Sequence, residues 1–430
     1  MKKLNWWKTG CAVCVLCAVT ITARAQSYSV LYTFTGELDG GSPAAALIAD
    51  SARDLYGTTQ SGGNFSSSCI APHDTCGVVF KLDQAGTEMV LYSFNAGGDG
   101  FGPSAGLVRD EAGNLYGTTL FGGNTSCDPS RGCGVVFKLD SAGSEAVIHS
   151  FGRADGKVPA ASLIRDPAGN FYGTASEGGD LTGLCSPDGC GVAFRLDPTG
   201  QHYMVLYRFT GGADGASPHA PLVRDAAGNL YGTAAAGGNG SSTCPFGASG
   251  CGVVFKIDPL GNETVLYSFT GKADGGTPEA GLIRDAAGNL YGTTVFGGTH
   301  GGSCPNGSNG CGVVFKLAPS GDETVLYTFT GAADGWAPYA SLIRDPAGNL
   351  YDTTQYGGNS SSSCPLGSFG CGVIFKLTPL GNETVLYTFT GGADGYWPIA
   401  GLSLVQGALY GTTFEGGAFG YGVVFKISLK

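Results

Sequence analysis

Charged residues are scarce in this sequence, and those present form no basic patch. Only 13% of the 430 residues are charged, and the formal net charge is −11 at pH 7. Proteins that bind nucleic acid or anionic membranes present clusters of Lys and Arg. We therefore expect a chain that binds no nucleic acid and does not insert into a membrane.

The sequence also lacks the short motifs of common enzyme classes. It has no phosphate-binding loop, no zinc-binding motif and no nucleophile elbow. The histidines occupy unrelated positions of the chain: His73, His149, His202, His219 and His300. We interpret His149 and His202 as structural, while His219 and His300 belong to segments that reach a variable loop face but have no nucleophile beside them. We assign no catalytic residue and expect no cofactor.

No apolar run at the N-terminus is long enough to span a membrane. Three lysines in the first eight residues precede an apolar segment over 10–22, followed by Ala23-Arg24-Ala25. A membrane-spanning helix needs about 20 apolar residues, whereas this order of charge, apolar run and small residues is typical of a cleaved secretory signal. Removal of residues 1–25 changes the net charge from −11 to about −15. We therefore expect a secreted protein, outside the cell or in the periplasm.

What the sequence does contain is a repeat. The phrase Leu-Tyr-Thr-Phe, or a close variant, occurs seven times at intervals of 57 to 60 residues. A self-similar period of this length indicates one supersecondary unit repeated in an array. The seven copies end at Phe34, Phe94, Phe151, Phe209, Phe269, Phe329 and Phe389.

Each repeat contains four strand-length segments separated by turns. In the fifth copy they lie at 280–284, 290–294, 312–317 and 324–329. The segments are rich in β-branched and aromatic residues, turn residues bound them, and no helical periodicity lies between them. Four antiparallel strands in about 60 residues, repeated seven times, predict an all-β, seven-bladed β-propeller over residues 27–430.

The two ends of the chain predict how the ring closes. The seventh copy has segments at 401–404, 409–412 and 422–426, but no fourth strand follows. The segment 29–34 is a spare copy of that missing strand. We expect it to complete the last blade and so remove an open sheet edge.

Twelve cysteines lie beyond the signal segment, in six pairs at one place in the repeat. The seventh copy lacks both members together, as bonded partners would. Two cysteines per repeat without a nearby His do not supply the four ligands of a zinc site. We therefore expect six local disulfides, each worth roughly 2 kcal/mol and acting mainly to hold a long loop in one shape. The pairs are Cys69/Cys76, Cys127/Cys133, Cys185/Cys190, Cys244/Cys251, Cys304/Cys311 and Cys364/Cys371.

These motifs together resemble a known family. The unit combines Asp-x-x-Gly-Asn-Leu-Tyr-Gly-Thr-Thr, Gly-Gly, Cys-Gly-Val-Val-Phe-Lys-Leu, Leu-Tyr-Thr-Phe and Ala-Asp-Gly, and it resembles the GloVer tandem repeat of secreted bacterial proteins. The resemblance covers nearly the whole chain after the signal segment. It implies an extracytoplasmic, propeller-like array with no catalytic residues to transfer. Members of that family end in varied surface anchors, whereas this sequence stops at Lys430, so we do not expect such an anchor.

The order of the strands separates the loops into two faces. The Asp-x-x-Gly-Asn and Pro-x-Gly-Asn turns share one face, and they vary little between copies. The Ala-Asp-Gly segments and the cysteine loops share the other, which we call the cysteine-loop face. Because binding sites need asymmetry, we expect function on this variable face.

A ring of aspartates enters the cysteine-loop face. One interpretation is a carboxylate ring that holds a hard cation such as calcium. The other, which sevenfold recurrence favours, is that each carboxylate caps its own Asp-Gly turn. We therefore predict no metal site at Asp39, Asp99, Asp155, Asp214, Asp274, Asp334 and Asp394.

Aromatic residues gather at the variable positions of copies five to seven. Exposed aromatic rings on a rigid platform can stack on sugars or accept a protein loop. Packing between neighbouring blades is the alternative explanation. The candidate ligand-binding residues are Phe296, Trp336, Tyr339, Tyr356, Tyr396 and Trp397.

The sequence favours a monomeric, non-enzymatic binding or scaffold module, whose partner is an extracellular glycan or protein. The alternative from another class is a polysaccharide hydrolase or lyase, with Glu177, Asp352 or Glu415 as acids at the channel mouth. A purely structural component of the envelope or matrix is the third possibility.

Overall fold

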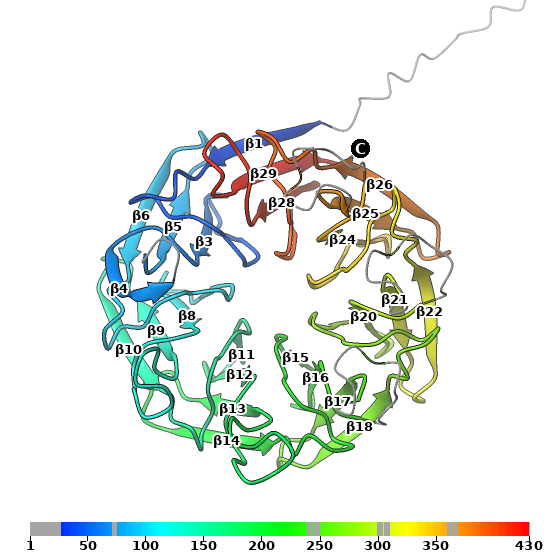
Figure 1. Ribbon diagram of the computed structural model, residues 1–430, viewed down its shortest axis with the longest axis horizontal. Coiled ribbons are helices and arrows are strands. Elements are labelled where there is room, and N and C mark those ends of the chain that lie inside the picture. The colour runs from blue at the N-terminus through cyan, green and yellow to red at the C-terminus, as the bar shows by residue number, and fades with distance from the viewer. Residues whose placement is uncertain are drawn as a thin grey trace, which may run out of the picture.

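The chain folds into seven four-stranded antiparallel sheets around a central axis (Figure 1). The computed structural model describes residues 27–70, 75–238, 244, 250–298, 304, 310–358, 364 and 369–429. The predicted seven-bladed β-propeller is confirmed. Among the described residues, no helix has the length and apolar character needed to cross a bilayer.

In blades 1 to 6 the strands run outward from the axis in chain order (Figure 1). Blades 1 to 3 comprise β2 (Ile48–Ala49), β3 (Leu55–Thr59), β5 (Val78–Leu82) and β6 (Glu88–Ser93); β7 (Val108–Arg109), β8 (Leu115–Thr119), β9 (Val135–Leu139) and β10 (Glu145–Ser150); and β11 (Ile164–Arg165), β12 (Phe171–Ala175), β13 (Val192–Leu196) and β14 (Tyr203–Arg208). The additional strand β4 (Phe65–Ile70) lies in the first cysteine loop.

The remaining blades repeat this pattern. Blades 4 to 6 comprise β15 (Val223–Arg224), β16 (Leu230–Ala234), β17 (Val253–Ile257) and β18 (Glu263–Ser268); β19 (Ile283–Arg284), β20 (Leu290–Thr294), β21 (Val313–Leu317) and β22 (Glu323–Thr328); and β23 (Ile343–Arg344), β24 (Leu350–Thr354), β25 (Val373–Leu377) and β26 (Glu383–Thr388). Blade 7 comprises β27 (Ser403–Val405), β28 (Ala408–Thr413), β29 (Val423–Ser428) and β1 (Tyr28–Thr33).

The first strand closes the ring, as the sequence predicts. Strand β1 pairs antiparallel with β29, from Tyr28 opposite Ile427 to Thr33 opposite Val423. In Figure 1 the blue β1 lies along the outer side of the red β29. The last blade is therefore built from both ends of the described chain.

The recurring phenylalanine explains how blades pack on each other. Phe329, which follows β22, is 1% exposed and meets Phe375 of the next blade edge-on, with ring centroids 5.2 Å apart. The same contact joins Phe389 to Phe425 at 5.5 Å and, across the closure, Phe34 to Phe80 at 5.2 Å. Both faces of each blade are buried by such contacts, so the strands carry apolar residues on both sides.

A threonine in each second strand adds a hydrogen bond between blades. Buried Thr58 donates its hydroxyl to the carbonyl oxygen of Ala105 in the next blade, at 3.0 Å. The last member of the series, Thr412, donates to Pro43 at 3.4 Å and so links blade 7 to blade 1. The segments that line the central channel are therefore tied to the neighbouring blade.

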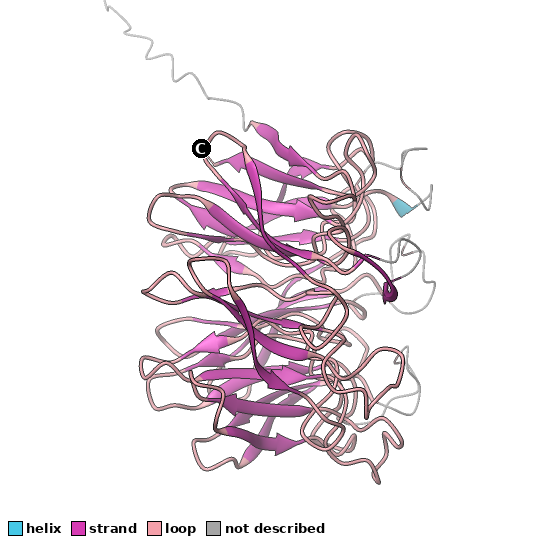
Figure 2. Ribbon diagram, turned by 90° about the vertical axis from the view of Figure 1, so that its left-hand side faces the viewer, coloured by secondary structure: helices cyan, strands magenta, loops and turns pink. Residues whose placement is uncertain are grey.

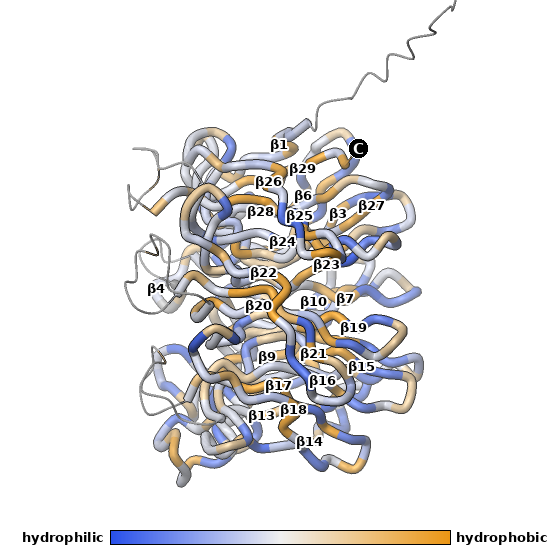
Figure 3. Tube along the Cα trace, turned by 90° about the vertical axis from the view of Figure 1, so that its right-hand side faces the viewer, coloured by the Kyte–Doolittle hydropathy of each residue, from blue (hydrophilic) through white to orange (hydrophobic). Residues whose placement is uncertain are grey.

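The two faces of the disc differ. Figure 2 shows short hairpin turns on one side and longer loops on the other. Figure 3 shows hydrophobic residues along the strands and hydrophilic residues in the turns and loops. The longer loops form the cysteine-loop face, from which the chain enters the channel at the start of each blade.

Candidate functional site

The segment that enters the channel is held by the preceding blade. In blade 6, Ala337 has a left-handed backbone (φ 56°), and its N–H donates to the carbonyl oxygen of Cys311 at 3.1 Å. Equivalent bonds run from Ser217 to Cys190 at 2.9 Å and from Thr277 to Cys251 at 2.8 Å. A left-handed backbone is unfavourable for residues other than glycine, and the surrounding bonds hold it in place. The second cysteine of one blade thus positions the channel residue of the next.

Two residues beyond this strained position lies a side chain that faces the channel. We call this sevenfold position the channel ring. It lines a cavity of about 270 Å³ on the axis. Its members are Ala44, Ser104, Ala160, His219, Glu279, Tyr339 and Ile399.

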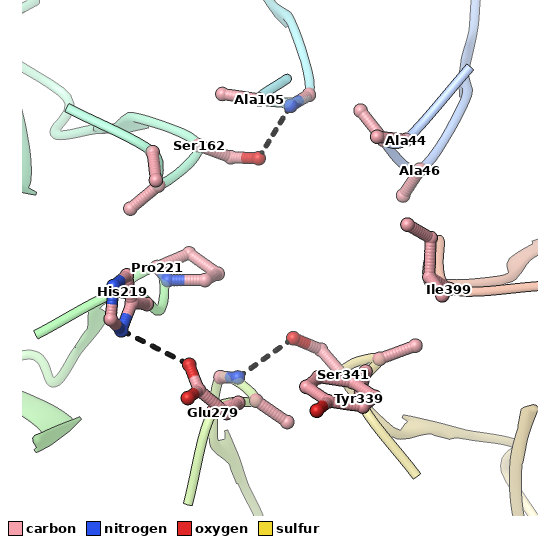
Figure 4. Close-up of a pocket in the computed structure, with 18 of the residues that line it drawn as sticks. Ala44, Ala46, Ala105, Ser162, His219, Pro221, Glu279, Tyr339, Ser341 and Ile399 are labelled. Carbon is pink, nitrogen blue, oxygen red and sulfur yellow. Dashed lines mark hydrogen bonds and ion pairs between the residues drawn. The ribbon is translucent and has the colours of Figure 1, made fainter. Parts of the chain in front are cut away.

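The ring is asymmetric, because its three bulky polar members are consecutive. His219, Glu279 and Tyr339 come from blades 4, 5 and 6, and Figure 4 shows them along one side of the cavity, opposite Ala44 and Ala105. The His219 Nδ1 and Glu279 Oε2 atoms form an ion pair at 3.0 Å. One side of the channel is therefore polar and hydrogen-bonding, and the other is lined by small residues.

The charges of this cluster follow from its surroundings. Burial lowers the pKa of His219, but the hydrogen bond and charge of Glu279 outweigh it, so the pKa of His219 lies above its ordinary value. Burial, together with Glu279 and Tyr356, raises the pKa of Tyr339 to about 12. The cluster thus combines an imidazole shifted toward its protonated form, a carboxyl group and a phenol that can donate a hydrogen bond.

A second, aromatic cavity adjoins the channel. It has a volume of about 180 Å³, and the lining residues are Val295, Phe296, Trp336, Ala337, Tyr339, Tyr356 and Phe369. Tyr339 lines this pocket as well as the channel, and it is 36% exposed. The two cavities are therefore neighbours that share one aromatic side chain.

The structure brings four of the six predicted aromatic residues together in this pocket. They are Phe296, Trp336, Tyr339 and Tyr356. Trp336 is only 3% exposed and stacks on Tyr356, with ring centroids 4.5 Å apart and an angle of 22°. Trp336 therefore forms a buried wall of the pocket, and Tyr339 is the most accessible aromatic ring of the pocket.

The other two predicted residues lie beside the pocket without lining it. Trp397 packs edge-on against Tyr356, with ring centroids 6.1 Å apart, and against Tyr396 at 5.4 Å. The Tyr396 hydroxyl donates to Glu415 at 2.5 Å. Both side chains are half-buried.

Two variable positions of each repeat lie opposite each other in the structure. In each blade the residue after Asp-Gly forms an antiparallel bridge with the residue before Gly-Gly. Their side chains match: Phe101 packs on Phe121 at 5.3 Å, and Lys157 forms an ion pair with Glu177 at 2.6 Å. Part of the variation between blades is therefore packing between the two members of a pair.

The six predicted disulfides are confirmed. All six pairs are bonded, at sequence separations of five to seven residues. Blade 7 has Tyr421 in place of the second cysteine, and its carbonyl oxygen accepts the corresponding hydrogen bond from Ser42 at 2.8 Å. Several disulfides in one chain are typical of an oxidising compartment, such as the periplasm or the cell exterior.

The structure adds a feature to the role expected for the cysteines, because the second member of each pair is buried in the core. Cys76 and Cys371 are 0% exposed. Cys76 packs in one cluster with Phe94, and Cys371 in another with Phe389. The other second cysteines, Cys133, Cys190, Cys251 and Cys311, are buried in the same way.

Burial of these cysteines has a physical reason. Each directly precedes the Gly that leads into the third strand, where the chain is covered by the next blade. The backbone carbonyl oxygen of Cys76 accepts a hydrogen bond from Gly102 at 2.9 Å, and that of Cys371 accepts one from Trp397 at 3.2 Å. The disulfides thus anchor the cysteine loops to the contact between blades.

The aspartate ring caps its own turns. Asp334 accepts hydrogen bonds from the Tyr327 hydroxyl at 2.9 Å and from the Thr330 backbone N–H at 2.8 Å. Asp274 and Asp394 make the same contacts. Among the described residues there is no cluster of three or more His, Cys, Asp or Glu side chains arranged to hold a metal ion.

None of the three acids considered for an enzyme lines the channel cavity. The interpretation that placed Asp352 at the channel mouth is wrong, because this residue lies in β24 and is 0% exposed. Glu177 of blade 3 is paired with Lys157. Glu415 of blade 7 accepts the Tyr396 hydroxyl. Each acid thus belongs to its own blade.

The other histidines lie elsewhere. The His149 ring stacks on Tyr203 with a centroid distance of 3.8 Å, and His202 is paired with Asp197 at 2.8 Å. His73 and His300 lie outside the described residues. Of the histidines that are described, only His219 faces the channel.

Sequence reasoning missed Glu279 and the pairing of His219 with it. The signal that would have found them is the residue that follows the proline of each Gly-x-x-Pro segment. This residue is small or aliphatic in four copies, but His, Glu and Tyr in three consecutive ones.

Several solved structures are similar to this chain at low sequence identity. A chain from a nidogen/laminin complex is 16% identical with a TM-score of 0.40, covering 74% of this chain and 91% of that one. TolB from Acinetobacter baumannii is 13% identical with a TM-score of 0.39, covering 73% of this chain and 61% of its own. A gluconolactonase from Xanthomonas campestris is 14% identical with a TM-score of 0.41, covering 76% and 86%.

Comparisons at the level of sequence identify the family. None of the curated protein sequences compared with the chain matches it. The model of the Gloeobacter/Verrucomicrobia repeat matches three overlapping or adjoining segments, residues 17–183, 71–303 and 301–430. These matches span nearly all of the seven blades. The chain belongs to the Gloeobacter/Verrucomicrobia repeat family.

Proposed function

We propose that the protein is a secreted, non-enzymatic module that binds a glycan at the channel mouth of its cysteine-loop face. The disulfides and the signal-like segment over 1–25 support a place outside the cytoplasm. The rigid ring of blades supplies the platform, and the asymmetric channel ring supplies the recognition.

One observation carries this proposal: the channel ring and the aromatic pocket meet at Tyr339. An aromatic ring next to a carboxyl group and an imidazole offers a stacking surface together with hydrogen-bond donors and acceptors. Sugars have an apolar ring face and hydroxyl groups that both donate and accept, so they match both halves of the site. Ligand sites commonly combine apolar walls with a few polar groups in this way.

The proposal is tested by measuring the binding of the purified chain from Ser27 to Lys430 to a panel of glycans. We expect at least one class of glycan to bind, and Tyr339→Ala to weaken that binding by about tenfold or more, since an aromatic stack contributes on this scale. Phe419→Ala is the matched control, because it removes an exposed aromatic ring that lines neither cavity.

Two results would contradict the proposal. Binding by Tyr339→Ala equal to that of the parent would place the ligand elsewhere. Release of new reducing ends or unsaturated products from a bound polysaccharide would show an enzyme and not a binding module.

A further inference from the structure

We infer that the ligand is an uncharged saccharide chain of at least two rings, with one ring in the aromatic pocket and its neighbour in the channel. This inference rests on the proposed function and adds the class and minimum length of the ligand. Three features carry it: the shared residue, the contrasting linings of the two cavities, and the distribution of charge.

The shared residue makes one ligand able to occupy both cavities. Tyr339 borders the channel cavity of about 270 Å³ and the aromatic pocket of about 180 Å³. Its side chain is the most exposed of the aromatic rings in this pocket. Neighbouring rings of one saccharide chain would therefore lie on either side of Tyr339.

The lining of the aromatic pocket fits one face of a sugar ring. Among the described residues that line it, none is a Lys, Arg, His, Asp or Glu. Phe296 and Tyr356 are half-buried, and Trp336 is held against Tyr356 at 4.5 Å. Such walls favour the C–H face of a ring over a charged group, which would lose its hydration without gaining a partner.

The channel side fits hydroxyl groups. Glu279 pairs with His219 through Oε2, which leaves Oε1 as an acceptor. When His219 is protonated, its Nε2 can donate, as can the hydroxyl of Tyr339. Neighbouring sugar hydroxyls can then accept from His219 and donate to Glu279.

The charges around the channel select against acidic sugars. Glu279 already pairs with His219, and Glu177 adds to the negative field at His219. Lys157 of blade 3 is paired with Glu177 at 2.6 Å and with Asp188 at 3.1 Å. A uronate or sulfate would therefore lie close to the carboxyl group of Glu279. His219 and Lys157 already have acidic partners, so neither is free to pair with the negative charge of the ligand.

The first test is a chain-length series of the neutral glycan found in the panel, from one ring to four. In the parent we expect affinity to rise by about tenfold between one ring and two, and little thereafter. Phe296→Ala should remove this rise, while His219→Ala should weaken every length. Phe296→Leu repeats the test with less loss of volume, and melting curves confirm that each variant is folded.

The second test compares neutral and uronate oligosaccharides of equal length. We expect the uronate to bind the parent at least about tenfold more weakly. Glu279→Gln, which keeps the shape and removes the charge, should narrow this gap. Glu111→Gln, the same exchange at an exposed turn residue of the opposite face, should leave the difference unchanged.

The outcomes separate the two claims. If no glycan binds the parent, the proposed function fails. If glycans bind but affinity does not depend on chain length, or the uronate binds more tightly, the proposed function stands and this inference is overturned.

Discussion

The hydroxyl of Tyr28 donates a hydrogen bond to the backbone carbonyl oxygen of Asp394, at 2.8 Å, across 366 residues of sequence. The Tyr28 ring also stacks on Tyr387, with centroids 3.8 Å apart and an angle of 7°. Strand β1 therefore joins blade 7 to blade 6 as well as pairing with β29. The closure of the ring depends on packing between blades in addition to the sheet hydrogen bonds.

Removal of residues 27–34 should destabilise the whole propeller. The deletion exposes an edge of β29 and removes buried Phe34 from its contact with Phe80. We expect a lower melting temperature and faster proteolysis than in the chain that starts at Ser27. The milder Tyr28→Phe keeps the stack and loses one hydrogen bond, and should cost about 1 kcal/mol. A trimmed chain as stable as the parent would contradict the closure.

The position of Tyr28 also leads to a prediction about pH. Five other blades have glutamate there, and in each of them burial, followed by the aspartate of the neighbouring turn, raises the glutamate pKa to about 7. One oxygen of each carboxyl is buried without a partner. The residues are Glu88, Glu145, Glu263, Glu323 and Glu383.

The sign follows from linkage. Between the ordinary value of 4.5 and the raised value of about 7, the folded protein holds protons that the unfolded chain has released. The free energy of unfolding therefore falls as pH rises through this window. We expect a higher melting temperature at pH 5 than at pH 8. Below about pH 4 stability should fall again, because turn carboxylates become protonated. At one of these, Asp285, burial raises the pKa but hydrogen bonds from Asn289 and Tyr291 outweigh it.

Glu323→Gln isolates one member of this set. Its neighbours are Asp274 and Tyr267. Because glutamine cannot ionise, the variant should melt above the parent at pH 8 and close to it at pH 5. A difference that is the same at both pH values would show that the charge of Glu323 is not the cause.

Asp352 gives a second pH-dependent prediction. It replaces a glycine found in the other six copies, and neither carboxyl oxygen has a partner with good hydrogen-bond geometry. A Cβ at the equivalent Gly292 would lie 2.7 Å from Phe315, so the position is also crowded. Burial raises the pKa of Asp352 well above its ordinary value, and the nearby backbone N–H of Thr353 offsets little of this. The folded state therefore loses stability as pH rises above about 4.

Asp352→Gly should stabilise the protein by about 2 kcal/mol or more at pH 7. Asp352→Asn, which keeps the volume without the charge, separates crowding from ionisation. The gain in melting temperature for Asp352→Gly should be smaller at pH 4 than at pH 7. If Asp352→Gly melts at the same temperature as the parent at pH 7, the buried carboxyl is not a source of instability.

The disulfides should affect the site selectively. Replacing both Cys304 and Cys311 by serine removes the bond that fixes the Cys311 carbonyl, which accepts from Ala337 and thereby positions Tyr339. We expect a loss of about 2 kcal/mol of stability together with weaker glycan binding. The matched control is Cys127→Ser with Cys133→Ser, in the distant blade 2, which should lose stability but keep binding. Equal binding by both double variants would contradict the link to Tyr339.

The fold can be predicted from sequence because its information is local and repeated. Turn residues bound each strand, and the spare segment at 29–34 matches the strand missing from blade 7. The site is harder to predict. Residues such as His219 and Glu279 are 60 positions apart in sequence. They come into contact only because neighbouring blades pack around the same channel. The aromatic positions are recognisable, but not the stacking of Trp336 on Tyr356, which buries one of them.

The cysteines illustrate the same limit. Their pairing can be predicted because both members recur, and are lost, together. The burial of Cys76 and Cys371 cannot, because it depends on the neighbouring blade that covers them. The spacing of the cysteines thus predicts the disulfide bond. The burial of that bond depends on how neighbouring blades pack in the assembled ring.

The most direct test of the account is the crystal structure of the protein with the glycan that binds it most tightly. We expect a sugar ring against Tyr339, with hydroxyl groups within hydrogen-bond distance of Glu279 and His219. A ligand on the opposite face of the disc, or in a blade that contributes none of these residues, would contradict it.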